Sequence, residues 1–280
     1  MSVSKRNLRT RRVSLAVLLS VLAVAISGCG DAVLTTPSPE VVETAESIAV
    51  DVTFTAPVSA TPDPEREDEA PIVLDGRVFG DGDTGVILVH MRTSDQTAWF
   101  PYATDLARDG DFTVLTFDFR GYGDSTGDKE FDRLDLDLDA AISFMRDTLE
   151  IADIYLIGAS MGGTAALISA SRTDVEGVVA ISPLSDFRYL DALDSIDELS
   201  APVAFFVAED DVAAARSVED LFGVAPNPKS LRVYEGDDHG LALFDGEHGP
   251  DLERSIARFV AEPLTYTSET GTPTPVPGEE

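Results

Sequence analysis

Short runs of mainly apolar residues alternate along the chain with segments whose apolar residues recur three or four positions apart. The first pattern is typical of strands buried in a sheet, and the second is typical of helices that cover a sheet with one face. The predicted strands are 72–79 (broken at 75–76 into a short hairpin), 86–90, 113–118, 154–157, 177–181, 203–208 and 231–234. The predicted helices are 97–108, 134–149, 212–222 and 250–260, together with a helix that begins after the turn at residue 160 and ends at 171. A short helical linker is also predicted to reach residue 200.

This alternation of strands and helices predicts an α/β fold, in which a mostly parallel, doubly wound sheet carries helices on both faces. Reactive side chains are then expected beyond the carboxyl ends of the strands. The connection between residues 181 and 203 is too short for a large lid domain, so the sequence predicts a shallow, open site.

Two segments have a pattern that fits more than one element. In Leu134–Asp139 leucine and aspartate alternate as in a half-buried strand, but the apolar stripe continues at helical spacing to Leu149, which favours a helix. Residues 48–54 also alternate, which is compatible with an edge strand inside a region otherwise rich in Thr, Pro, Val and Glu.

The first 28 residues have the features of a secretory signal. Basic residues precede an apolar run from Val13 to Ile26, which at 14 residues is shorter than the ~20 that a membrane-spanning helix needs. Thr10–Leu15 partly resembles a twin-arginine export signal, but Ser14 stands where that signal prefers Phe. The sequence therefore predicts export and leaves open whether the general or the twin-arginine route is used.

The tetrapeptide Ile26–Cys29 resembles the lipoprotein box of bacteria, with Ile26 where that motif more often has Leu. The resemblance implies cleavage before Cys29, acylation of its thiol, and anchoring at the outer face of the bacterial cell membrane. Cys29 is the single cysteine of the chain, so neither an intrachain disulfide nor a cysteine metal cluster can form.

Composition divides the remainder of the chain. Residues 29–71, after the signal at 1–28, are expected to form a flexible spacer that begins at the acylated Cys29. Residues 72–262 are expected to form the folded domain, and 263–280, rich in Thr and Pro, a disordered tail.

The 280-residue chain has 51 acidic and 20 basic residues and a formal net charge of −31. Such a charge argues against nucleic acid as a partner, because phosphates need a basic surface. We interpret the excess as an acidic solvated surface, and the oligomeric state is not indicated.

The sequence Gly158-x-Ser160-x-Gly162 follows a buried strand and precedes small residues that suit a helix. This context predicts a sharp turn that projects the Ser160 hydroxyl above the edge of the sheet. A serine hydroxyl becomes a nucleophile when a base takes its proton, and the base needs an orienting carboxylate. Ser160 is therefore the candidate nucleophile, and the backbone N–H of Met161 is a candidate donor to the oxyanion that would form.

Three histidines could supply the base. His239 lies in a polar loop directly after the last predicted strand and is preferred, whereas His248, near the last helix, is expected to be a surface or capping residue. The acid is expected at another strand end, where Asp210 and Asp211 are both candidates and Asp186 is a remoter alternative.

At this point the chain resembles the α/β-hydrolase family over about residues 72–262. The motifs that carry the resemblance are Val89-His90, Asp118-x-Arg120-Gly121-x-Gly123-x-Ser125, the Ser160 turn, the acidic strand end, and Asp238-His239-Gly240. Ser160, Asp211 and His239 follow the order of nucleophile, acid and histidine in that family. The family often has Gly-x-x-Asp at the acid turn, and Ala208–Asp211 aligns with this pattern on Asp211, with Asp210 as runner-up. The resemblance also implies Met91 N–H as the second oxyanion donor, a structural role for His90, and loop-stabilising roles for Asp118, Arg120 and Asp124.

These features predict a serine hydrolase that cleaves a small carboxylic ester through an acyl-enzyme, with no metal or organic cofactor. The same three side chains would also serve amide or peptide cleavage and perhydrolysis. A non-catalytic binding module at the cell surface, built on a hydrolase fold, is the alternative of a different class.

Overall fold

The computed structural model describes residues 49–61, 69–109 and 112–263. The predicted signal, Cys29, most of the predicted spacer and all but the first residue of the predicted tail lie outside these residues. Within the described ranges, no helix combines the length and the apolar character that crossing a membrane requires.

The centre of the domain is an eight-stranded sheet. From one edge to the other its strands are β1 (Ala49–Ala56), β2 (Ile72–Phe79), β4 (Phe112–Phe117), β3 (Thr84–Val89), β5 (Ile154–Ala159), β6 (Gly177–Ile181), β9 (Val203–Ala208) and β10 (Lys229–Tyr234). The pairs β1–β2 and β2–β4 are antiparallel, and every pair from β4 to β10 is parallel. The predicted mostly parallel α/β sheet is therefore confirmed.

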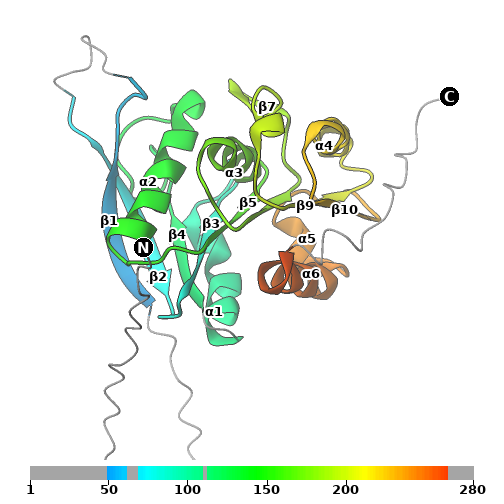
Figure 1. Cartoon of the computed structure of the whole chain (residues 1–280), viewed down its shortest axis with the longest axis horizontal. Coiled ribbons are helices and arrows are strands. Elements are labelled where there is room, and N and C mark those ends of the chain that lie inside the picture. Colours follow the sequence, from blue (N-terminus) through cyan, green and yellow to red (C-terminus); the bar gives the residue numbers. More distant parts are fainter. Residues whose placement is uncertain (1–48, 62–68, 110–111, 264–280) are drawn as a thin grey trace, which may run out of the picture. The chain divides into compact units, whose positions relative to one another are not determined.

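Helices cover both faces of this sheet (Figure 1). The helices α2 (Leu134–Asp147), α3 (Met161–Arg172) and α4 (Val212–Val224) pack on one face, and α1 (Phe100–Asp109) and α6 (Gly249–Ala261) pack on the other. Side chains of β3 alternate between the two cores, with Ile87 and Val89 on the α2 side and Val86 and Leu88 on the α1 side. The two-sided burial explains why the central strands are continuous apolar runs.

The segment with alternating leucine and aspartate is helical, as predicted. In α2 the fully buried Leu134, Leu138 and Ile142 face the sheet at a spacing of four residues. The helical register also buries Asp137, whose carboxylate pairs with the guanidinium of Arg120 at 2.7 Å. A strand would have placed all of these leucines on one face and all of the aspartates on the other.

The amino-terminal edge of the sheet differs from the prediction in two ways. Ile72–Phe79 is one continuous strand rather than a hairpin, because Gly76 permits close approach of β4: a Cβ at this position would lie 2.8 Å from the Thr116 carbonyl oxygen. The possible strand near residues 48–54 is present as β1, which pairs with β2 along its whole length. The sheet thus begins at Ala49, inside the predicted spacer, and the predicted domain boundary at residue 72 is too late.

The connection from β6 to β9 holds no large lid. It contains a small hairpin of β7 (Asp186–Phe187) and β8 (Leu190–Asp191), followed by the 3-10 turn η3 (Ile196–Glu198). The predicted helical linker is therefore largely wrong, because most of this segment is hairpin and loop. The segment between β6 and β9 thus adds only a small hairpin and a 3-10 turn at the carboxyl edge of the sheet.

Candidate active site

Ser160 stands between β5 and α3 in a backbone conformation that non-glycine residues rarely adopt, with φ 50° and ψ −119°. Two glycines make this turn possible. A Cβ at Gly158 would lie 2.3 Å from the Gly162 carbonyl oxygen, and one at Gly162 would lie 2.4 Å from the Val89 carbonyl oxygen. The backbone N–H of Ser160 donates to the Ile181 carbonyl at 2.8 Å, which fixes the turn to β6.

The structure brings the Ser160, His239 and Asp211 side chains together in a hydrogen-bonded chain. His239 Nε2 lies 2.8 Å from Ser160 Oγ, and His239 Nδ1 lies 2.5 Å from Asp211 Oδ2. Because a carboxylate only accepts, Nδ1 carries the proton and Nε2 is left to accept from the serine hydroxyl. The Asp211 side chain is 12% exposed and that of His239 is 37% exposed, so the acid is more shielded than the base that faces the open site.

The other candidate residues from the sequence lie elsewhere. Asp210 donates its backbone N–H to the Gly236 carbonyl at 2.9 Å, which ties the acid loop to the His239 loop, but it is Asp211 whose carboxylate reaches the imidazole. The Asp186 carboxylate accepts from the Tyr189 N–H in the β7–β8 turn. His248 lies at the N-cap position of α6 without a side-chain cap bond, and its ring nitrogen contacts the Glu235 carbonyl at 3.1 Å.

Ser182 is a site residue that the sequence reasoning missed. It follows β6 with φ 47°, and it is fully buried. Its hydroxyl oxygen accepts from the Gly240 N–H at 3.0 Å, one residue after His239, so it holds the base loop to the sheet. Its place directly after a predicted parallel strand was the available signal, since the carboxyl ends of such strands meet at this edge.

The two backbone N–H groups predicted to stabilise an oxyanion lie in the segments next to Ser160 and His90. They belong to Met91, after β3, and Met161, at the first turn of α3, and neither donates to an acceptor within the described residues. The first turn of a helix also carries a partial positive charge that favours an anion. The absence of a described acceptor is compatible with the oxyanion role, which stays a prediction for both groups.

His90 holds the loop that carries Met91. Its Nδ1 donates to the Met91 carbonyl at 2.8 Å, and its Nε2 accepts from the Phe119 N–H at 3.1 Å. Burial lowers the pKa of His90 to about 4, so the ring is neutral at pH 7 and can accept and donate at once. This arrangement fits the structural role expected for His90.

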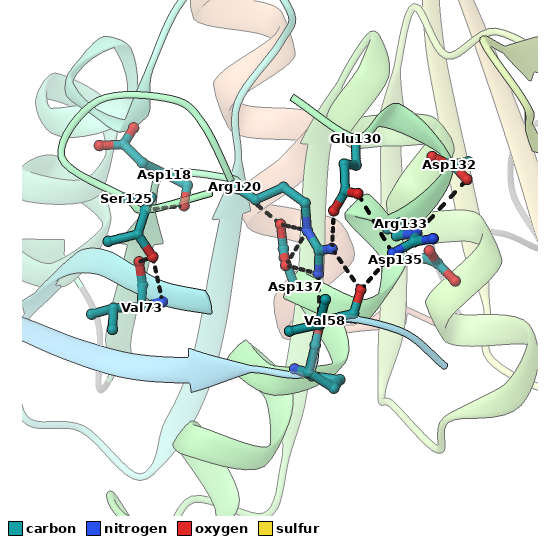
Figure 2. Close-up of polar contacts among 12 residues, drawn as sticks. Val58, Val73, Asp118, Arg120, Ser125, Glu130, Asp132, Arg133, Asp135 and Asp137 are labelled. Carbon is teal, nitrogen blue, oxygen red and sulfur yellow. Dashed lines mark hydrogen bonds and ion pairs between the residues drawn. The ribbon is translucent and has the colours of Figure 1, made fainter. Parts of the chain in front are cut away.

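The loop from Asp118 to Ser125 is anchored at several points, as Figure 2 shows. Asp118 accepts from the Gln96 N–H at 2.8 Å, and the Ser125 hydroxyl donates to the Asp118 carbonyl at 2.6 Å. Arg120 is fully buried, pairs with Asp137 and donates to the carbonyls of Pro57 and Val58 just beyond β1 (Figure 2). These contacts agree with the loop-stabilising roles expected for Asp118 and Arg120, whereas the role of Asp124 stays a prediction. The Arg120 contacts also explain why β1 belongs to the domain.

This geometry has the components of nucleophilic acyl transfer. The imidazole can take the serine proton, the carboxylate can stabilise the imidazolium, and the two N–H groups can stabilise an oxyanion. Within the described residues, no group of three or more His, Cys, Asp or Glu side chains is arranged to hold a metal ion.

Comparisons with known proteins agree with the topology. Residues 86–223 match the family model described as the alpha/beta hydrolase fold. The Escherichia coli K12 protein YfhR is 25% identical over 202 residues, which cover 64% of this chain and 70% of YfhR. An esterase of Pyrococcus furiosus superposes with a TM-score of 0.62 at 20% identity, covering 77% of this chain and 91% of the esterase. A bromoperoxidase of Bacillus anthracis superposes with a TM-score of 0.60 at 16% identity, covering 76% and 100%. The family match and the strand order together identify the domain as one of the α/β-hydrolase fold.

Proposed function

We propose that this protein is a serine hydrolase that cleaves carboxylic esters through an acyl-enzyme. The observation that carries the proposal is the hydrogen-bonded chain from Asp211 through His239 to Ser160. Ser160 Oγ attacks the ester carbonyl while His239 Nε2 takes its proton, and the oxyanion is stabilised by the N–H groups of Met91 and Met161. The protonated His239 then donates to the leaving alcohol, and a water activated in the same way releases the acid.

Three features support an ester as the substrate. The structurally similar Pyrococcus furiosus protein is named an esterase. The short β6–β9 connection leaves the site open to small substrates. An ester is also the easier bond to cleave, because an alkoxide leaves the tetrahedral intermediate more readily than an unprotonated amide nitrogen. Amide cleavage and perhydrolysis use the same groups. The rates of three reactions are therefore to be compared directly: hydrolysis of 4-nitrophenyl acetate, hydrolysis of 4-nitroacetanilide, and formation of peracetic acid from acetate and peroxide.

The test is hydrolysis of 4-nitrophenyl esters of rising acyl length by the folded protein and its variants. Ser160→Ala and His239→Ala are expected to lower kcat by about 10⁶-fold, and Asp211→Asn by about 10⁴-fold, as in serine hydrolases built on these groups. Asp210→Asn and His248→Gln are the matched controls, since neither side chain contacts Ser160 or the His239 ring. Retention of activity in Ser160→Ala, or loss in Asp210→Asn comparable to Asp211→Asn, would contradict the assignment.

A further proposal concerns where the enzyme works. We propose that the chain is exported and anchored by a lipid on Cys29 at the outer face of the bacterial membrane, on the evidence of the lipoprotein-like sequence alone. In a bacterial host fed a radiolabelled fatty acid, the protein is expected to take up label and to sediment with membranes, and Cys29→Ser is expected to do neither. Equal labelling of the two proteins would refute the proposal.

A further inference from the structure

Most cations in the described part of the chain have an oxygen partner. Arg77, Arg108, Arg120, Arg133, Arg172, Arg232 and Arg254 each pair with a carboxylate, and Arg146 and Lys229 donate to backbone carbonyls. Four described cations, Arg92, Lys129, Arg188 and Arg216, form no ion pair with a described residue, although the chain has 51 acidic side chains. Arg216 lies in α4, whereas Arg92, Lys129 and Arg188 lie in loops and a turn at the carboxyl edge of the sheet.

The loop and turn cations are carried by segments next to the candidate active site. Lys129 Nζ lies 3.7 Å from the centre of the Tyr122 ring. Arg92 directly follows Met91, whose N–H is a candidate oxyanion donor. The Arg188 guanidinium lies 4.9 Å from the centre of the ring of Phe131, two residues after Lys129. Burial raises the pKa of Tyr122, and the positive charges of Arg92 and Arg188 oppose that rise. The Tyr122 hydroxyl in turn lies 3.8 Å from the sulfur of Met161, the residue after the nucleophile. Lys129 thus contacts a side chain that reaches the residue after the nucleophile.

Each cation is carried by a segment that the fold holds in place. Arg92 follows Met91, whose carbonyl accepts from His90 Nδ1 and from the Ser94 N–H at 3.2 Å. Arg188 stands in the β7–β8 turn with φ 49°, and its guanidinium lies 4.9 Å from the centre of the Phe131 ring. The ring contacts of Lys129 and Arg188 restrict exposed side chains that would otherwise sample many rotamers, which lowers the entropic cost of binding a ligand.

The carboxylates nearest in sequence are engaged elsewhere. Glu130, adjacent to Lys129, pairs with the buried Arg120 at 3.1 Å. Asp186, in the same hairpin as Arg188, accepts from the N–H that follows Arg188 at 3.2 Å. The three cations are therefore free to bind an anion from outside, and guanidinium groups match the geometry of a carboxylate well.

We propose that Arg92, Lys129 and Arg188 bind a carboxylate of the substrate, so that the enzyme prefers esters that carry an anionic group next to the scissile bond. The proposal rests on the ester hydrolysis proposed above and names its substrate class. A net charge of −31 repels anionic substrates as a whole, and a local positive site beside Ser160 offsets that repulsion and steers the anion to the nucleophile. Either the acid or the alcohol of the ester can carry this carboxylate, and the substrates described next distinguish the two cases.

Two matched pairs of substrates test the preference. The acid-side pair is the mono-4-nitrophenyl ester of adipic acid and the same compound with its free carboxylate methylated. The alcohol-side pair is 4-acetoxybenzoate and its methyl ester, with product release measured at pH 7. The variants are Arg92→Gln, Lys129→Gln, Arg188→Gln and the Arg92→Gln/Arg188→Gln double variant. Arg108→Gln is the control, because it removes the same charge from the last turn of α1, which leads into the amino end of β4.

The wild type is expected to have a higher kcat/KM for the anionic member of one pair, by about tenfold or more, the range of a charge-assisted contact. The double variant is expected to lose that ratio while its kcat/KM on the neutral member stays within about twofold, and raising the salt concentration is expected to shrink the ratio. Arg108→Gln is expected to keep it. Absence of a preference in both pairs, or a preference unchanged in the double variant, would overturn the proposal.

A binding measurement separates this proposal from that of ester hydrolysis. The Ser160→Ala protein is titrated with monomethyl adipate and with 4-acetoxybenzoate by calorimetry, which needs no turnover. If one of these ligands binds, and its affinity falls about tenfold when Arg92→Gln and Arg188→Gln are added to Ser160→Ala, the result supports the anion site even if no ester is cleaved. Failure of both ligands to bind would overturn it even if neutral esters are cleaved.

Discussion

His90 should make the stability of the domain fall in a defined pH window. The ring is fully buried, and burial lowers its pKa from the ordinary 6.5 to about 4. Between these two values the unfolded chain binds a proton that the folded protein does not, so the free energy of unfolding falls as the pH is lowered from 7 to 4. Below pH 4 both states are protonated and His90 causes no further loss.

The size of this effect follows from the shift. At 1.36 kcal/mol per pKa unit, a fall from 6.5 to about 4 corresponds to about 3 kcal/mol of stability lost across the window. Buried carboxylates act in the opposite direction, because burial raises the pKa of Asp118 and Asp137 and protonation then favours the folded state. The effect of His90 is therefore measured as a difference between the wild type and a variant in which these carboxylates are unchanged.

The appropriate variant is His90→Gln, whose amide can still donate to the Met91 carbonyl and accept from Phe119 N–H. Urea unfolding, followed by the fluorescence of Trp99, the single tryptophan and 1% exposed, gives the free energy of unfolding at each pH. The advantage of the wild type over His90→Gln is expected to shrink by about 3 kcal/mol between pH 7 and pH 4. If the difference between the two proteins is constant across this range, His90 is not held neutral by burial. His90→Asn serves the same comparison if the first variant does not fold.

Other predictions concern the anchors of the site. Asp137→Asn leaves the buried Arg120 without its charged partner and is expected to cost about 3 kcal/mol or more in urea unfolding, and a cost below about 1 kcal/mol would contradict the role of this pair. Ser182→Ala removes the acceptor of the Gly240 N–H and is expected to lower kcat about tenfold with little change in KM, because His239 loses its support; an unchanged kcat would show that the loop needs no such bond. Phe54→Ala in β1 removes a ring that packs on two aromatic side chains and is expected to cost about 3 kcal/mol, whereas a true spacer residue would cost nothing.

The strands that could be predicted are those whose burial produces a recognisable pattern of apolar residues within the strand itself. β5, β6 and β9 are buried on both faces, so each is an uninterrupted apolar run bounded by turn residues. The edge strand β1 has an exposed outer face, and its alternation is weak beside the polar residues around it. Its place in the sheet depends on pairing with β2 and on the contacts of Arg120, which no local pattern contains.

The residues of the candidate site could likewise be predicted only where a local sequence pattern places them. Ser160 and His239 could be named because a strand, a tight turn and a loop place them at one edge of the sheet. The choice between Asp210 and Asp211 rested on family resemblance, because adjacent carboxylates on a turn differ only in the direction in which the backbone aims them, which the structure supplies. The free cations next to the candidate site could not be found from the sequence at all, because an unpaired charge is defined by the absence of a tertiary partner.

The most direct test of the central claim is covalent labelling of Ser160 by a fluorophosphonate, read by intact mass and peptide mapping. A hydroxyl activated by His239 and Asp211 is expected to give one adduct per chain, on Ser160, with none on Ser160→Ala and much slower labelling of His239→Ala. A protein shown to be folded by the fluorescence of Trp99 that takes up no label, or takes it up at another residue, would contradict the account.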